Sequence, residues 1–286
     1  MSAPGSEPRP SRPARGTCTW HVPPRERQQN MRPRQRAASS WEVYQAALLA
    51  QCAAGGPLMK DLIDIFLQPS AVLGRLKDQP NFFLPLLLIV GLTAVASYLY
   101  FDRVDAAWFM ERSIAASGQD VSEKDLQAIR ANGPSSGMLK WTGSIGGSVG
   151  ILVSFLAFGL YYFLAGKVTG LALSYKQGLA LAAWSAMPTL ISTILLLVGV
   201  FGMSPQTPIE SLVLTSVDPM LVQLPPESPW KGLATSASFL AIWTTWLAAL
   251  GWKLWSQAKQ WPGAVVVAAL PTVLIYGGMA IKALLN

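Results

Sequence analysis

The chain has 286 residues, of which 51% are hydrophobic and only 13% are charged, about half the charged fraction of a typical soluble domain. Its formal charge of +7 comes mainly from residues 1–58, which hold eight Arg and three Glu, and no later basic run could follow a nucleic-acid backbone. This composition excludes an ordinary soluble domain and a nucleic-acid-binding protein.

Residues 1–58 differ from the rest of the chain in composition. They are rich in Pro, Ser, Ala and Arg, lack Lys, and contain both cysteines and the only histidine. This composition predicts a disordered basic extension, an organellar transit peptide, or a segment that is not translated. We favour a start at Met59, because a helical pattern begins directly after it. From Met59 onward the lack of Cys and His excludes disulfides, zinc sites and thiolate or imidazole catalysis.

Residues 59–81 are predicted to form an interfacial amphipathic segment of two short helices. Apolar residues recur at helical spacing on both sides of Pro69, which can begin the second helix because its missing N–H costs nothing there. A helix pair packed under the membrane domain is the alternative to one lying in the interface. The predicted interfacial contact residues lie on and beside the apolar face of the second helix: Leu73, Arg75, Leu76 and Lys77.

Five stretches without a charged residue follow, and each is longer than the roughly 20 residues that cross a bilayer. Basic residues in the short links after the second and fourth stretches predict a cytoplasmic N-terminus and an external C-terminus. The prediction for residues 82–286 is an all-α, polytopic, five-helix transmembrane bundle, with spans at about 82–101, 142–166, 178–202, 233–252 and 263–284.

Four glycines near the start of the second predicted span are candidates for helix packing. Gly143, Gly146, Gly147 and Gly150 form two overlapping four-residue spacings. Because helices in lipid associate through close backbone contact, this spacing predicts a packing face. The partner helix can belong to the same chain or to a second copy.

Two prolines lie near the middle of predicted spans. Pro188 and Pro271 each remove a helical hydrogen bond and predict a kink, which either packs against a neighbour or lines a substrate path. The uncharged stretches lack the acidic and basic groups that a proton-coupled carrier, an ion pump or an intramembrane protease needs. We therefore expect no catalytic, cofactor-binding or metal-binding residue.

Three parts of the chain together resemble one family of membrane proteins. The parts are Ile65–Ser70 leading to Pro80–Pro85, Tyr175–Ala180 leading to Trp184–Pro188, and Phe239–Trp243 continuing through Gly251 and Gly263 to Pro271. In order and spacing, about residues 60–284 are similar to the bacterial branch of the Yip (Ypt-interacting protein) family. The resemblance implies a five-helix membrane protein with a cytosolic N-terminus and without known catalysis.

The resemblance does not extend to GTPase binding. Eukaryotic members of the family bind Rab-type GTPases, partly through an acidic-aromatic motif before the first span. Residues 78–82 of this chain, Asp-Gln-Pro-Asn-Phe, depart from that motif, so GTPase binding is not expected here.

The expected function is that of a non-enzymatic protein of the bacterial cytoplasmic (inner) membrane that organises lipid or protein partners. Membrane lipids are the expected partners, together with a second copy of the chain or another membrane protein. The alternative is a permease or lipid facilitator that works without intramembrane charges and uses the kinks at Pro188 and Pro271.

Overall fold

The computed structural model of the chain describes residues 57–116, 122–124, 127, 133–225, 227–257 and 260–285. These residues are mainly helical and contain no β-strand, with a single antiparallel bridge between Ser216 and Ser238. The all-α class is therefore confirmed. The predicted extension of residues 1–58 lies outside the described residues, except for Pro57 and Leu58, which begin the first described helix.

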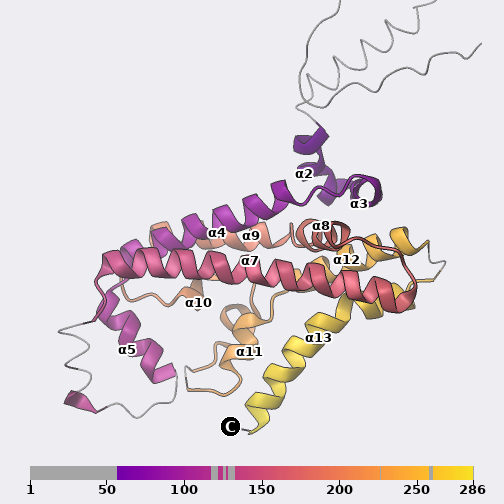
Figure 1. Cartoon of the computed structure of the whole chain (residues 1–286). Helices are drawn as coiled ribbons and strands as arrows, with labels where there is room; N and C mark the ends of the chain where they lie inside the picture. Colours follow the sequence, from indigo (N-terminus) through magenta and orange to yellow (C-terminus); the bar gives the residue numbers. More distant parts are fainter. Residues whose placement is uncertain are drawn as a thin grey trace, which may run out of the picture. The chain divides into compact units, whose positions relative to one another are not determined.

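Two short helices, α2 (Pro57–Leu67) and α3 (Pro69–Asp78), precede the long ones. Pro69 occupies the first turn of α3, where a helix has no use for its backbone N–H. Gln68 is the only residue between the two helices, so the chain turns sharply and brings α2 against α3. In Figure 1, α3 lies next to α8 with α2 above it, and both short helices share a hydrophobic core with α8 and α12.

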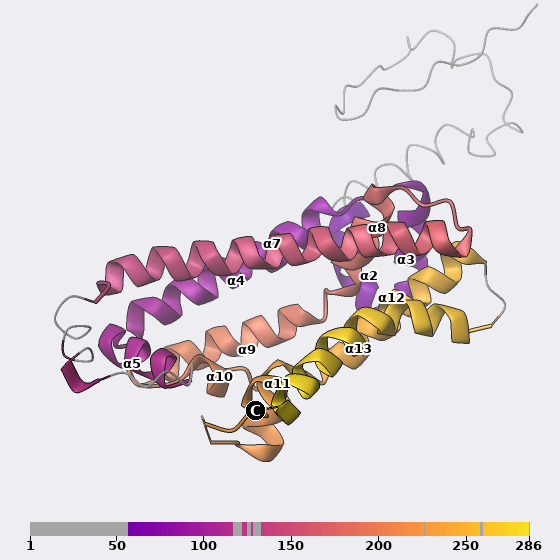
Figure 2. The ribbon, with the colours of Figure 1, turned by 60° about the horizontal axis from the view of Figure 1, so that its bottom comes forward.

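Long apolar helices account for most of the described chain. Within the described residues, three helices are long and apolar enough to cross a membrane: α4 (Phe83–Arg103), α7 (Ser136–Thr169) and α13 (Pro262–Leu285). The pair α8 (Tyr175–Ser185) and α9 (Thr189–Gly202) makes a fourth if it is counted as one span bent by 47°. In Figures 1 and 2, α4 runs alongside α7, and these helices pack against each other.

The predicted fourth span, residues 233–252, is not one continuous helix. It is divided between α11 (Lys231–Ser236) and α12 (Leu240–Ser256). The carbonyl of Ala237, between these helices, accepts a hydrogen bond of 2.8 Å from the N–H of Val217. The preceding loop thus pairs with the chain at this point and interrupts the helix. Because α12 has only 17 residues, the predicted count of five spans is not established.

Local sequence defines the turn between α7 and α8. Gly170 ends α7 with a φ of +75°, a conformation that suits glycine because it has no Cβ. Ser174 begins α8 with a capping box: its hydroxyl accepts from the N–H of Gln177, and the Gln177 side chain accepts from the N–H of Ser174.

Two buried clusters hold the helices together. The larger one joins α2, α3, α8 and α12 with parts of α4, α7 and α13, and contains the fully buried Trp184 and Trp255. The smaller one lies where α4 and α9 meet α5 (Ala106–Ala116) and α10 (Ile209–Leu212). The short helix η3 (Asp218–Val222) contacts α10. Tyr100, at the centre of the smaller cluster, donates a hydrogen bond of 3.0 Å to the carbonyl of Thr207.

Candidate functional site

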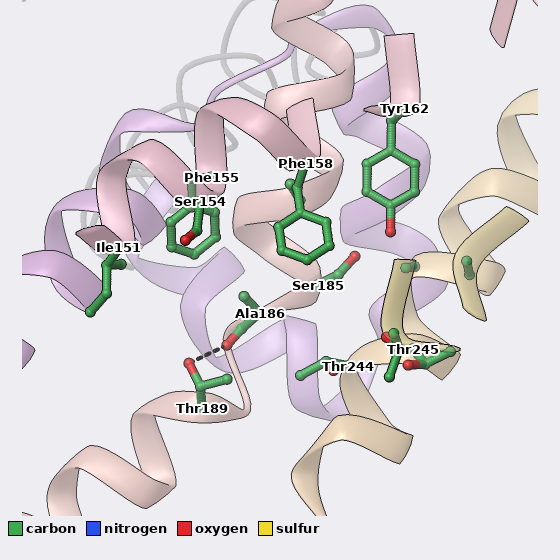
Figure 3. Close-up of a pocket in the computed structure, with 14 residues that line it drawn as sticks. Ile151, Ser154, Phe155, Phe158, Tyr162, Ser185, Ala186, Thr189, Thr244 and Thr245 are labelled. Atoms are coloured by element: carbon green, nitrogen blue, oxygen red, sulfur yellow. Dashed lines mark hydrogen bonds between the residues drawn. The ribbon is translucent and has the colours of Figure 1, made fainter. Parts of the chain in front are cut away.

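A cavity of about 260 Å³ lies between α7, the break between α8 and α9, α12 and α13 (Figure 3). None of its described lining residues carries a formal charge. Apolar and aromatic side chains form most of the wall, and hydroxyl groups interrupt it at several points. The residues that bring hydroxyl groups to the lining are Ser154, Tyr162, Ser185, Thr189, Thr244, Thr245 and Thr272.

The cavity has a buried end and an open side. Tyr162 and Ser185, each 4% exposed, belong to the buried end, and Figure 3 shows their hydroxyl groups directed into the same space. Ser154 is exposed and belongs to the open side. The Ser185 hydroxyl has no hydrogen-bond partner among the described residues. A buried hydroxyl without a partner is costly and calls for an explanation.

Three of the other hydroxyl groups differ from Ser185 because they have a hydrogen-bond partner on the backbone. Ser154, Thr189 and Thr244 donate to backbone carbonyls three or four residues earlier, at 2.8, 2.7 and 3.0 Å. Such local bonds satisfy a serine or threonine on a helix without any further group. Among the described lining residues, Ser185 is the one whose side-chain oxygen is both fully buried and without a hydrogen-bond partner.

The two predicted kink residues directly precede lining residues. Pro188 precedes Thr189 at the break where α8 and α9 meet at 47°. Pro271 precedes Thr272 within α13, which continues through it without interruption. Both prolines thus adjoin the cavity in sequence, although neither lines it.

The predicted interfacial residues of α3 divide into two groups. Leu73 and Leu76 are 0% and 4% exposed, so they pack into the main core and do not form a free contact surface. Arg75 is exposed and pairs with Asp61 of α2. Lys77 points back to the bundle, where its ammonium donates a hydrogen bond of 2.8 Å to the carbonyl of Trp255.

Indole and amide donors hold α3 in the position in which its apolar face is buried. The Trp255 indole donates to the carbonyl of Leu73 at 2.7 Å, and the Gln177 amide donates to that of Lys77 at 2.6 Å. The Trp184 indole donates to the carbonyl of Asn81 at 2.5 Å, just before α4 begins. These bonds fasten the end of α3 and the link to α4 onto α8 and α12.

The outer face of α2 carries a row of exposed apolar side chains that the sequence analysis did not single out. Met59, Ile63 and Leu67 are spaced by four residues, lie on one face of the helix, and are 60%, 62% and 72% exposed. Ile65, on the opposite face, is fully buried in the main core. The core contacts of α2 therefore hold this row outward.

The four predicted packing glycines do not share one environment. A Cβ at Gly143 would lie 2.2 Å from the Phe101 ring, so this glycine lies against α4. A Cβ at Gly147 would lie 3.9 Å from Ser97 of the same helix, an ordinary contact. Gly146 and Gly150 have nothing within 4 Å of such an atom and are exposed. Only part of the glycine face therefore adjoins another helix of this chain.

A closer helix crossing occurs at two glycines that the sequence analysis did not identify. A Cβ at Gly178 of α8 would lie 2.5 Å from the carbonyl oxygen of Gly159 of α7. No side chain fits between these backbones. Their signal in the sequence is weak, because the glycines are 19 residues apart and belong to different helices.

An ion pair between the partly exposed Lys231 and the buried Asp218 organises the connection before α11. The Lys231 ammonium lies 2.6 Å from Oδ2 of Asp218 and 2.8 Å from the carbonyl oxygen of Leu224. Oδ1 of Asp218 accepts a hydrogen bond of 2.9 Å from the N–H of Leu224. The charges are mutually paired, so we assign this cluster a structural role.

The comparisons with known proteins give one family. Residues 63–281 match the Yip1 domain, which covers more than half of the chain and reaches from α2 to near the end of α13. No curated protein and no solved structure matches the chain. The matched region contains the long apolar helices and the cavity between them. The chain therefore belongs to the Yip1 domain family and is an integral membrane protein.

Proposed function

We propose that this protein is a non-enzymatic, five-span protein of the bacterial cytoplasmic membrane that organises lipid or protein partners. The observation that carries the proposal is the exposed apolar row of α2, formed by Met59, Ile63 and Leu67. Exposure of three large apolar side chains to water on one helical face is unfavourable, so this face favours contact with lipid or with another protein. The N-terminus lies in the cytoplasm and the C-terminus outside.

The position of α2 in the chain favours contact of its exposed apolar row with the membrane surface. Only residues 79–82 separate α3 from α4, so the helix pair lies close to one end of a long apolar helix. At this level the boundary between headgroups and acyl chains accepts the apolar face of an amphipathic helix. Because α3 is fastened to the bundle, the helix pair keeps a fixed position. It can therefore present the same surface to bound lipids, to a second copy of the chain or to another membrane protein.

Copurification of the full-length tagged chain in polymer discs, with mass spectrometry of proteins and lipids, tests the proposal. The double variant Ile63→Asp, Leu67→Asp places charges on the exposed row while sparing the core, so folding should persist. We expect recovery of the specific lipid or protein partner to fall by about tenfold, equivalent to roughly 1.4 kcal/mol of binding free energy.

The matched control is Met220→Asp, Leu221→Asp, which changes two exposed apolar residues in η3. Equal losses in the two double variants would show that α2 has no special role, and an unchanged partner profile in the α2 variant would reject the proposal. Leu73→Asp and Leu76→Asp are unsuitable for this test, because a charge at either buried position would destabilise the core.

A permease or lipid facilitator is the second candidate function. The cavity beside the α8–α9 break favours it, since discontinuous helices line the substrate sites of many transporters. Reconstituted protein should then accelerate the transbilayer movement of a fluorescent neutral lipid, and Pro188→Ala or Pro271→Ala should slow it. Movement equal to that in protein-free vesicles would exclude this candidate.

A further inference from the structure

We infer that the cavity between α7, α8, α12 and α13 binds an uncharged single-chain lipid whose polar group is a hydroxyl or an ester. Ser185 is the polar contact at its buried end. The inference rests on the proposed function, because it names the class of lipid that this membrane protein holds within its helices.

The polarity of the buried end sets the orientation of the ligand. An acyl tail inserted to this depth would leave the Ser185 hydroxyl without a hydrogen-bond partner. A hydroxyl or ester group would supply one, and Figure 3 places Tyr162 on the opposite side of the same space. The polar end of the ligand therefore lies deepest, and its chain extends toward Ile151 and Ser154 on the open side.

The lack of charge in the lining selects the headgroup. A phosphate or ammonium group in this cavity would lose its hydration without gaining an opposite charge from any described lining residue. Neutral hydroxyl and ester groups lose much less on leaving water and can be satisfied by serine, threonine and tyrosine side chains. Phospholipids are therefore poor occupants and monoacylglycerols are suitable ones.

The route of access identifies the bilayer as the source of the ligand. The lining residues of α7 fall between Ile151 and Tyr162, in the middle of a helix that extends from Ser136 to Thr169. An opening at that height faces the hydrocarbon of the membrane and not water. The volume of about 260 Å³ is slightly below the roughly 300 Å³ of the smallest typical ligand pockets, so part of the acyl chain remains outside in lipid.

Photolabelling of the full-length chain in phosphatidylcholine nanodiscs tests the inference. The probe is a photoactivatable monoacylglycerol with an alkyne tag, and the competitors are unlabelled monoacylglycerol and lysophosphatidylcholine of the same chain length. We expect saturable labelling of α7 and α12 peptides that monoacylglycerol suppresses at least about tenfold more effectively than lysophosphatidylcholine.

Two variants and one control locate the site. Ser185→Ala removes the polar contact and should raise the half-saturating probe concentration about five- to tenfold. Ala248→Leu fills the space from α12 and should abolish saturable labelling. Ser144→Ala removes another buried, unpartnered hydroxyl, from the α4 side of α7, and should leave labelling unchanged. Thermal unfolding of each variant reports whether it is folded.

The possible results separate this inference from the proposed function. The lipid site is overturned if labelling does not saturate, or if folded Ser185→Ala and Ala248→Leu are labelled as strongly as the unmodified chain. Either result means that the cavity holds only water or bulk lipid. If partner recovery in the polymer-disc experiment is intact at the same time, the proposed function stands. Absence of any specific partner from the unmodified chain overturns the proposed function, whatever the labelling result.

Discussion

Replacement of Gly178 by alanine tests the crossing of α7 and α8, where the two backbones come close together. The added methyl group would lie 2.5 Å from the carbonyl oxygen of Gly159 and 3.2 Å from the backbone nitrogen of Phe163. Backbone atoms cannot rotate aside, so α8 would have to move away from α7. Overpacking of this kind costs about 1–3 kcal/mol, and the better helix propensity of alanine returns at most about 1 kcal/mol. We expect a net loss of about 1–2 kcal/mol.

The same substitution at two other glycines supplies the controls. At Gly146 the methyl group meets nothing within 4 Å, so we expect no loss of stability. At Gly143 it would lie 2.2 Å from the Phe101 ring, a side chain that can turn away, so we expect an intermediate loss. Each of the three variants adds one methyl group to the chain, and only the surroundings of that group differ between them.

Thermal unfolding in detergent micelles, followed by circular dichroism, measures the three variants. For soluble proteins of 150–250 residues, 1 kcal/mol lowers Tm by about 2–4 °C, so Gly178→Ala should unfold about 2–8 °C below the unmodified chain. Gly146→Ala should unfold at the temperature of the unmodified chain or slightly above it, because alanine favours the helix and its methyl group meets no other atom. If Gly178→Ala and Gly146→Ala have the same Tm, the crossing of α7 and α8 at this glycine is refuted.

Two further substitutions test the hydrogen bonds that fasten α3 and the connection before α11. Trp255→Phe should lower the free energy of unfolding by about 1–3 kcal/mol, because the buried carbonyl of Leu73 loses its donor, whereas Trp246→Phe at an exposed position should have little effect in the same unfolding assay. Lys231→Met should leave the buried Asp218 without its cation at a local cost of about 1–3 kcal/mol, because the pair is partly exposed and the N–H of Leu224 still donates to the carboxylate. Limited proteolysis should then cut residues 203–230 faster, and an unchanged cleavage rate would contradict this role of the ion pair.

The long helices could be predicted from the sequence because a helix that crosses a bilayer needs about 20 consecutive, mainly apolar residues. The first, second and fifth predicted spans correspond to α4, α7 and α13, each extended by a few residues at one or both ends. The predicted fourth span differs because the backbone is extended at Ala237, whose carbonyl accepts a hydrogen bond from Val217 and not from the next helical turn. The sequence of residues 233–252 alone does not indicate that Ala237 bonds to Val217, which lies 20 positions earlier in the chain.

The candidate site depends on contacts between distant segments, so the sequence revealed only parts of it. Pro188 and Pro271 marked the neighbourhood of the cavity, whereas the unpartnered hydroxyl of Ser185 became evident only when four helices were placed around it. The inward face of α3 could not be separated from an interfacial one, because apolar spacing is the same in both. The exposed apolar row of α2 could have been predicted from the sequence, since Met59, Ile63 and Leu67 recur every four residues.

The bend between α8 and α9 has a consequence for how the protein is made. Every residue from Gly178 to Ser185 is buried by protein, whereas Val200 alone is buried among the residues of α9. The small residues of α8 gain little from lipid, so α9 supplies most of the hydrophobicity that draws this segment into the bilayer. The surface that covers α8 includes α12, which is synthesised later. The burial of α8 by protein is therefore completed only after α12 has been made, whereas α9 can enter the lipid before that.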